Sequence, residues 1–158
     1  MKTLNKKSGF SLLELVVVVA ILAVVIPGMM QLFVSATALS DVSGSKSAAM
    51  AEVYTKMEEI RNHEFTSIVT DYASGGTPGN SFDSMILSGG KGMVFASPYN
   101  GSNDILEVRI VMSWQDSRGR VIGEDANRDG VFLISEDVNN DGQYSSPATF
   151  VSYIAKRH

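Results

Sequence analysis

Two acidic stretches near the C-terminus carry side chains of the type and spacing that bind a hard cation. Residues 124–130 read Glu-Asp-Ala-Asn-Arg-Asp-Gly, and residues 136–142, twelve positions later, read Glu-Asp-Val-Asn-Asn-Asp-Gly. Oxygen-bearing side chains at alternate positions, followed by a glycine that permits a sharp turn, allow one short loop to direct several oxygens at a single ion. The repeat therefore predicts binding of a cation such as calcium.

The first copy matches the Asp-x-Asn-x-Asp-Gly-x5-Glu calcium-loop pattern in full. In this interpretation three side chains supply oxygens, one residue supplies its backbone carbonyl, and a last carboxylate binds through both oxygens. These ligands are, in that order, Asp125, Asn127 and Asp129, then Val131, then Glu136. The flanking sequence does not predict paired helices, so the motif is a calcium loop without an EF-hand.

The second copy is less complete. It offers Asp137, Asn139 and Asp141, but Ala148 stands at the closing position, so a second site either binds weakly or takes an acid from elsewhere. The alternative for both copies is a pair of solvated Asp-Gly turns, because Asp, Asn and Gly favour turns without any metal. The chain has no cysteine, and a bound ion could stabilise a small exported domain as a disulfide would, which favours the metal.

A third chemically unusual position is Glu14. Residues 15–26 have no polar side chain, and Glu14 is the only charged residue between 10 and 34. The segment from residue 10 to residue 34 is long enough to cross a bilayer core of roughly 30 Å as a helix. An ionised carboxylate near hydrocarbon costs roughly a few kcal/mol, so Glu14 needs a partner, and the neighbouring sequence supplies none.

The residues before the apolar run differ from a secretory signal. Such a signal places its small-residue cleavage site after the apolar segment, whereas here the small residue Gly9 comes before it. A cut between Gly9 and Phe10 would remove the three lysines of residues 1–9 and leave a new amino group four residues from Glu14.

Residues 6–15, Lys-Lys-Ser-Gly-Phe-Ser-Leu-Leu-Glu-Leu, resemble the leader and cleavage site of type IV prepilins and the related pseudopilins. In that family a membrane peptidase cuts after the glycine and methylates the new N-terminus, and the glutamate pairs with the N-terminus of a neighbouring subunit. The resemblance implies that Gly9 ends the leader, Phe10 is the methylated first residue, and Glu14 is the assembly carboxylate. A plain signal anchor, which shares only the basic-then-apolar order, is the alternative.

Charge and composition exclude several function classes. The formal charge is -4, and loss of residues 1–9 would remove three of the 13 basic residues and none of the 17 acidic ones. No nucleic-acid partner is predicted from such a chain, although a local patch could still serve DNA uptake. Without cysteine there is no thiolate metal site or Cys nucleophile. The two histidines, His63 and His158, and the serines match no catalytic pattern, so no enzyme is predicted.

The elements that must position these residues follow from hydrophobic periodicity. We expect an α+β pilin fold, in which a long N-terminal helix packs on a small antiparallel sheet. Its parts are a cleaved leader at 1–9, a hydrophobic transmembrane and assembly helix at 10–34, an amphipathic extension at 35–63 and a β-rich head at 64–158. In the extension Met50, Val53, Met57 and Ile60 share one face, which should lie against the sheet.

Two features could interrupt the helix, Pro27-Gly28 and the serine-glycine patch at 43–45. In the head, residues 107–114 alternate with period two and predict a half-buried strand. The turn at 116–119 leads to a second hairpin arm at 120–122, and a last strand is expected at 149–155. Glycine-rich stretches at 74–80 and 88–92 predict loops.

These features together predict a structural subunit of a type IV pilus-like filament, more specifically a minor pilin. A pseudopilin of type II secretion is one alternative, and a membrane-anchored calcium-binding or adhesion module that never polymerises is another. Expected partners are other pilin or pseudopilin subunits, the prepilin peptidase, the inner-membrane assembly platform and the membrane. The lysines of the leader place the N-terminus in the cytoplasm, with the head in the periplasm or outside the cell.

Overall fold

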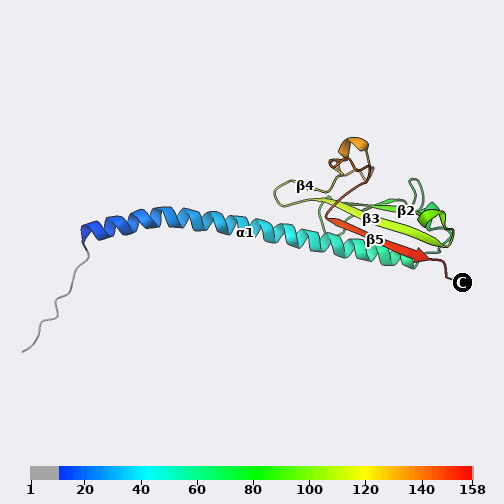
Figure 1. Ribbon diagram of the computed structural model, residues 1–158, viewed down its shortest axis with the longest axis horizontal. Helices are drawn as coiled ribbons and strands as arrows, with labels where there is room; N and C mark the ends of the chain where they lie inside the picture. The colour runs from blue at the N-terminus through cyan, green and yellow to red at the C-terminus, as the bar shows by residue number, and fades with distance from the viewer. Residues whose placement is uncertain (1–10, 158) are drawn as a thin grey trace, which may run out of the picture. The chain divides into compact units, whose positions relative to one another are not determined.

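The structure is a computed structural model that describes residues 11–157 (Figure 1). The chain divides into two compact units, one up to Ser40 and one from Asp41 onward. Gly9 and Phe10, for which the sequence predicts cleavage and methylation, lie outside the described residues.

In the first unit the described residues belong almost entirely to helix α1 (Leu12–Arg61), whose later turns continue into the second unit. All the large apolar side chains from Leu12 to Val34 are exposed. By length and composition α1 is able to cross a membrane. A helix that is apolar all round needs a cover of lipid or of other helices, since water is a poor solvent for it.

Neither of the two features that could interrupt α1 does so. The helix continues through Pro27 and through residues 43–45. Proline lacks only its own N–H, so the helix loses one hydrogen bond there while its other bonds remain. In the serine-rich patch the hydroxyls of Ser45 and Ser47 donate to the carbonyls of Val42 and Ser43, at 3.0 Å each, and so are satisfied within the helix itself.

The last turns of α1 supply one side of the core of the second unit. Val53, Met57 and Ile60 are buried as the periodicity predicts, and Ala49 joins them. Met50, expected on the same face, is only partly buried at the edge of this cluster. The side chains at spacings of three and four residues thus form the apolar stripe that contacts the sheet.

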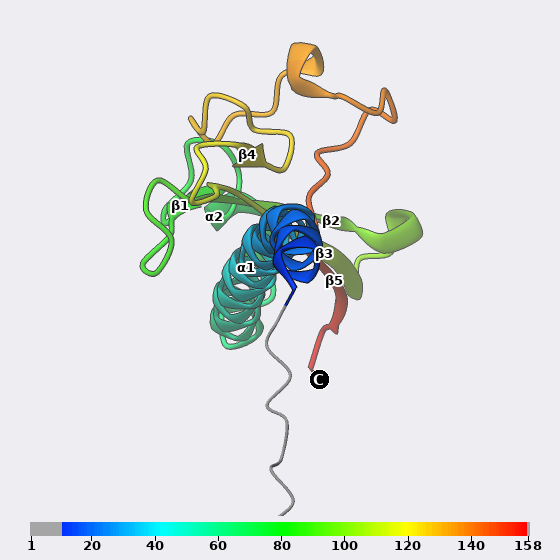
Figure 2. The ribbon, with the colours of Figure 1, turned by 90° about the vertical axis from the view of Figure 1, so that its left-hand side faces the viewer.

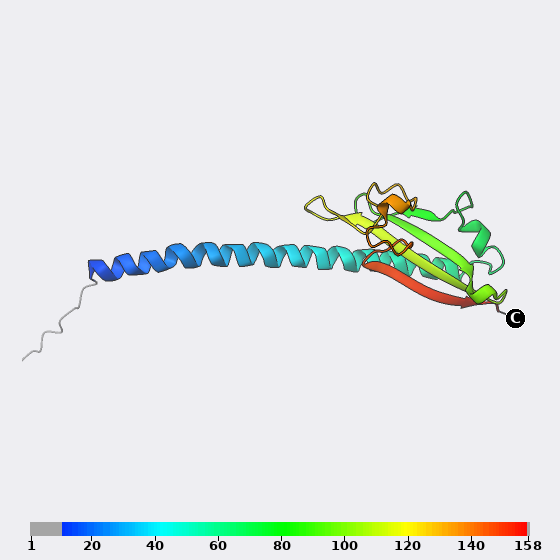
Figure 3. The same ribbon diagram turned by 45° about the horizontal axis from the view of Figure 1, so that its top comes forward.

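The sheet has five antiparallel strands, with β3 at its centre (Figures 1 and 3). β2 pairs with one edge of β3, and β5 and β4 pair with successive parts of the other edge, while β1 pairs with β2. The strands are β1 (Ser81–Asp83), β2 (Lys91–Pro98), β3 (Ile105–Gln115), β4 (Val121–Ile122) and β5 (Ala148–Ala155). Short helical segments are α2 (Ile68–Asp71), η1 (Tyr99–Gly101) and η2 (Ile134–Glu136). The predicted α+β architecture, the hairpin and the last strand are confirmed.

The prediction that β3 is half-buried is wrong for its second half. Val108, Ile110, Met112 and Trp114 face the core beneath α1 as expected. Val111, on the opposite face, is equally buried, because it forms a second cluster with Met93 and Tyr144 and with two further aromatic rings. Residues 124–146 fold back over this face and cover it (Figure 2).

Candidate functional site

The first acidic loop is organised by its own carboxylates. Asp125 is fully buried, and its two oxygens accept the backbone N–H groups of Asp129 at 3.1 Å and Gly130 at 3.0 Å. The Asn127 side chain accepts the N–H of Asp129 at 2.9 Å, and Asp129 accepts that of Val131 at 2.8 Å. These bonds close a tight turn, and Gly130 has the positive φ of 75° that glycine adopts readily.

The second acidic loop repeats this bonding pattern twelve residues later. Asp137 accepts the N–H groups of Asp141 at 3.3 Å and Gly142 at 2.8 Å, and Asn139 also accepts from Asp141, at 2.8 Å. Asp141 accepts the N–H of Gln143 at 2.7 Å. The sequence repeat is therefore a structural repeat of two equivalent turns.

The closing positions of the two loops differ. Glu136 turns back to the first loop, where its Oε1 accepts the N–H of Asn127 at 3.3 Å. Its Oε2 is buried and has no hydrogen-bond partner within residues 11–157. Ala148, at the corresponding position of the second loop, is a buried residue of β5 paired with Met112 and can supply no side-chain ligand.

An acid from the first loop reaches the end of the second. Glu124 is nearly buried, its Oε2 accepts the N–H of Ser145 at 2.8 Å, and its own N–H donates to the Ser145 carbonyl at 3.1 Å. This role of Glu124 is not visible in the sequence, because the contact joins residues 21 positions apart. Among the described residues, no group of three His, Asp or Glu side chains is placed to hold a metal ion. Asp125 and Asp137 instead accept backbone N–H groups.

Tyr144 attaches both loops to the sheet. Its hydroxyl donates to Ser113 Oγ at 2.7 Å, and the same oxygen receives the N–H of Asp125 at 3.4 Å. Arg109 donates to the Tyr144 carbonyl at 2.8 Å while its guanidinium lies over the ring of Phe95. Burial raises the pKa of Tyr144, so the phenol stays protonated and remains a donor.

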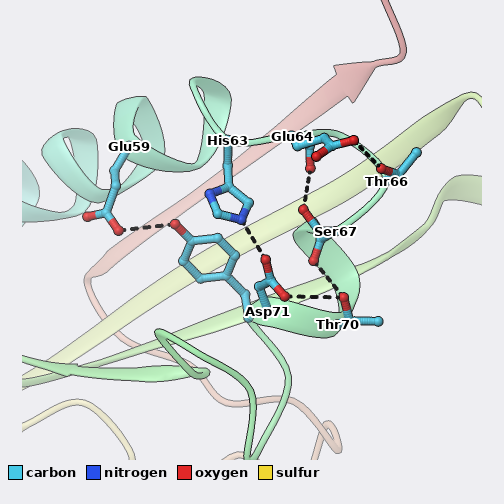
Figure 4. A network of polar contacts seen from close by, with 8 residues as sticks. Glu59, His63, Glu64, Thr66, Ser67, Thr70 and Asp71 are labelled. Atoms are coloured by element: carbon cyan, nitrogen blue, oxygen red, sulfur yellow. Dashed lines mark hydrogen bonds and ion pairs between the residues drawn. The ribbon is translucent and has the colours of Figure 1, made fainter.

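A second polar cluster lies where α1 ends (Figure 4). His63 Nε2 is 2.7 Å from Asp71 Oδ2, and the hydrogen bond with His63 holds the pKa of Asp71 below its usual range. Tyr72 stacks edge-on against His63 and donates to Glu59 at 3.0 Å. Burial raises the pKa of Tyr72 to about 12, which keeps this donor protonated.

A histidine paired with an aspartate could act as a general base. Here the contacts around the pair are structural ones. The nearby Ser67 hydroxyl donates to the Glu64 carbonyl, and Thr70 donates to the Ser67 carbonyl, so neither hydroxyl is directed at His63. His63 is partly buried and ties α2 to the end of α1.

Glu14 lies in the first turn of α1 and is exposed. Within the part of the chain that the structure describes, it makes no hydrogen bond or ion pair, although its charge is favourably placed at a helix N-terminus. A family model described as the prokaryotic N-terminal methylation motif matches residues 4–26, a segment that includes Gly9, Phe10 and Glu14. The chain carries the signature of type IV pilins and pseudopilins.

The match covers the N-terminal segment alone, so the pilin signature says nothing of the acidic loops. Comparison with curated proteins and with solved structures gave no match. The α+β architecture, in which the end of α1 packs on an antiparallel sheet, agrees with that signature.

Proposed function

We propose that this chain is a structural subunit of a type IV pilus-like filament, a minor pilin, and not an enzyme. The observation that supports this most directly is Glu14, a carboxylate that forms no ion pair within residues 11–157 and stands at the start of an exposed apolar helix inside the methylation motif. The prepilin peptidase removes residues 1–9 and methylates Phe10, and the assembly platform of the inner membrane then moves the helix from lipid into the filament. In the filament the apolar residues of α1 pack against other subunits.

Processing is tested by the mass of the mature chain isolated from the producing cells. We expect the mass of residues 10–158 plus one methyl group, located on the amino group of Phe10. Replacement of Gly9 by valine should leave the full-length chain, because the bulkier side chain blocks the cut, whereas Ser8→Ala should be processed normally. A wild-type chain that keeps residues 1–9 would contradict the proposal.

The choice of a minor pilin rests on two features that resemble such subunits, namely the strand that carries Trp114 and the calcium-type insertion before the closing strand β5. A pseudopilin of type II secretion remains the alternative, because the same motif serves both systems. Deletion of the gene for this chain in its host should reduce the number of surface pili and leave protein secretion unchanged. Loss of secretion with normal pili would favour the pseudopilin.

We further infer that the head binds calcium as a structural ion. In the first loop Asp125, Asn127 and Asp129 supply side-chain oxygens, Val131 a carbonyl and Glu136 a carboxylate. The buried Oε2 of Glu136 supports this assignment, since a buried carboxylate oxygen without a partner is costly and a cation would satisfy it. Bound calcium would join the two ends of the loop. The same proposal extends to the second loop, where Asp137, Asn139 and Asp141 supply the ligands of a second site.

Calcium binding is tested by thermal unfolding of the full chain in detergent, with calcium or with a chelator. An ion at about 100 times its Kd stabilises the folded state by roughly 2.7 kcal/mol, a rise in melting temperature of several degrees. Asp129→Ala should abolish this rise. Asp104→Asn, which changes an exposed carboxylate outside both loops, should retain it. A wild-type chain indifferent to both calcium and chelator would contradict the inference.

A further inference from the structure

Four apolar side chains project from the first acidic loop and the residues that follow it. Val131, Leu133, Ile134 and Val138, here named the apolar tip, are 52%, 44%, 84% and 81% exposed. They lie in and around η2, on the side of the sheet away from the part of α1 in this unit (Figures 1 and 2). Neighbouring apolar groups this exposed are a typical mark of a contact surface.

The surroundings of the apolar tip are strongly acidic. Residues 124–142 contain six carboxylates and one cation, Arg128. Glu124, Asp125 and Asp137 are buried, so the carboxylates that face a partner are those of Asp129 and Asp141, with Glu136 partly exposed. None of the six forms an ion pair within residues 11–157. Even two bound calcium ions would leave the segment with a negative formal charge. A partner for the tip must therefore combine apolar surface with positive charge, which disfavours an anionic lipid surface or a nucleic acid.

The same unit offers a concave surface of that kind. A pocket of about 920 Å³ lies between the end of α1, the residues after it and the end of β5. We name it the basic pocket, after Arg61, Lys156 and Arg157, and its apolar part is formed by Phe65 and Ile154. Two acids also line it: Glu58, which is paired with Arg61 at 2.7 Å, and Glu64, which accepts the Thr66 hydroxyl at 3.0 Å. The three basic residues outnumber them. Lys156 and Arg157 pair with no carboxylate in the described chain, so their charge is available to a ligand.

We propose that the apolar tip of one copy inserts into the basic pocket of a second copy. Within one copy the two surfaces cannot meet, because the tip covers one face of the sheet while the pocket lies at the end of α1, which packs on the other. The tip supplies apolar side chains surrounded by acidic residues. The pocket supplies apolar side chains surrounded by basic residues. A contact between two different surfaces of the same chain is heterologous and can repeat from copy to copy.

The absence of cysteine makes this contact directly testable in the full-length chain in its native membrane. A chain carrying both Val138→Cys and Lys156→Cys should form dimers and a ladder of larger species under mild oxidation. Each single variant should form no ladder, since one cysteine can join only two chains. As a matched control, Val138→Cys combined with Met85→Cys, a 98% exposed residue outside the pocket, should give collisional background only.

Charge reversal provides a second test of the contact. A cysteine pair at Val138 and Ile154 reports the same contact and leaves both basic residues free to be changed. Added to this pair, Lys156→Glu with Arg157→Glu should reduce the cross-linked fraction by about tenfold, because like charges would then face each other across the contact. Cross-linking no stronger than the Met85 control, or unaffected by the reversal, would overturn the inference. Since leader cleavage and filament formation are measured separately, a chain that is processed and assembles but does not cross-link would overturn this contact alone.

Discussion

Glu14→Gln is expected to abolish filament assembly while the protein remains processed and anchored in the membrane. Glutamine keeps the size and polarity of the side chain and removes only its charge. In the proposed filament the methylated amino group of a neighbouring Phe10 would then lie in an apolar environment without a counter-charge. Loss of one partner of a buried ion pair costs roughly 3–5 kcal/mol, which weakens each contact by about two to four orders of magnitude.

The measurement is the amount of filament sheared from cells, determined by electron microscopy and by immunoblot against the membrane-bound pool. Ser11→Ala is the matched control, because it changes an exposed polar residue of the same region without altering charge. If the Glu14→Gln variant assembles filament at the wild-type level, the carboxylate is not needed for assembly. If the unmodified chain is never cut and never assembles, the membrane-anchored calcium-binding or adhesion module becomes the better interpretation.

The helical part of the fold was predictable because its signals are local. The apolar segment at residues 10–34, in which Glu14 is the only charge, indicates a membrane-length helix. The spacing of Val53, Met57 and Ile60 identifies the face that packs on the sheet. Pro27 and the glycine between serines do not interrupt α1, although both residue types disfavour a helix. Their cost is local, and the long helical segments on either side, together with the packing of the last turns, outweigh it.

The first hairpin of the sheet was not predicted. β2 begins with Lys91 and Gly92 and ends at Pro98, and its central Met93 and Val94 are both buried, on opposite faces. A strand covered on both sides shows no alternation, so the period that reveals a half-exposed strand is missing. The reason for a glycine at position 92 is also not visible in the sequence. The ring of its cross-strand partner Phe82 occupies the space that a side chain would need.

In the acidic loops the sequence predicted what depends on neighbours along the chain and missed what depends on distant ones. The spacing of Asp and Gly accounts for the two equivalent turns, whose bonds join residues two to five positions apart. Tyr144 and Glu124 were missed, since one contacts Ser113 across 31 positions and the other Ser145 across 21. Calcium ligation itself stays a prediction.

Trp114→Ala is expected to destabilise the head more than any other single substitution considered. The side chain of Trp114 is fully buried in the cluster that joins α1 to the sheet, on the central strand and opposite Ile122 of β4. Truncating a buried aromatic residue removes its apolar contacts and leaves a cavity, which costs about 3–5 kcal/mol. For a unit of this size that corresponds to a fall in melting temperature on the order of 10–20 °C.

The comparison with Trp114→Phe separates packing from hydrogen bonding. The indole N–H of Trp114 has no acceptor within residues 11–157, so its removal loses no bond, and phenylalanine should retain most of the stability at a cost of about 1–2 kcal/mol. Far-ultraviolet circular dichroism follows the melt, since the only tryptophan is lost in both variants. Equal destabilisation by both substitutions would show that the N–H matters, and an alanine variant with the wild-type melting temperature would contradict the central position of this side chain. Because Trp114 faces α1 while its neighbour Ser113 holds the acidic loops on the opposite face, the alanine variant should keep its response to calcium at temperatures where it is folded.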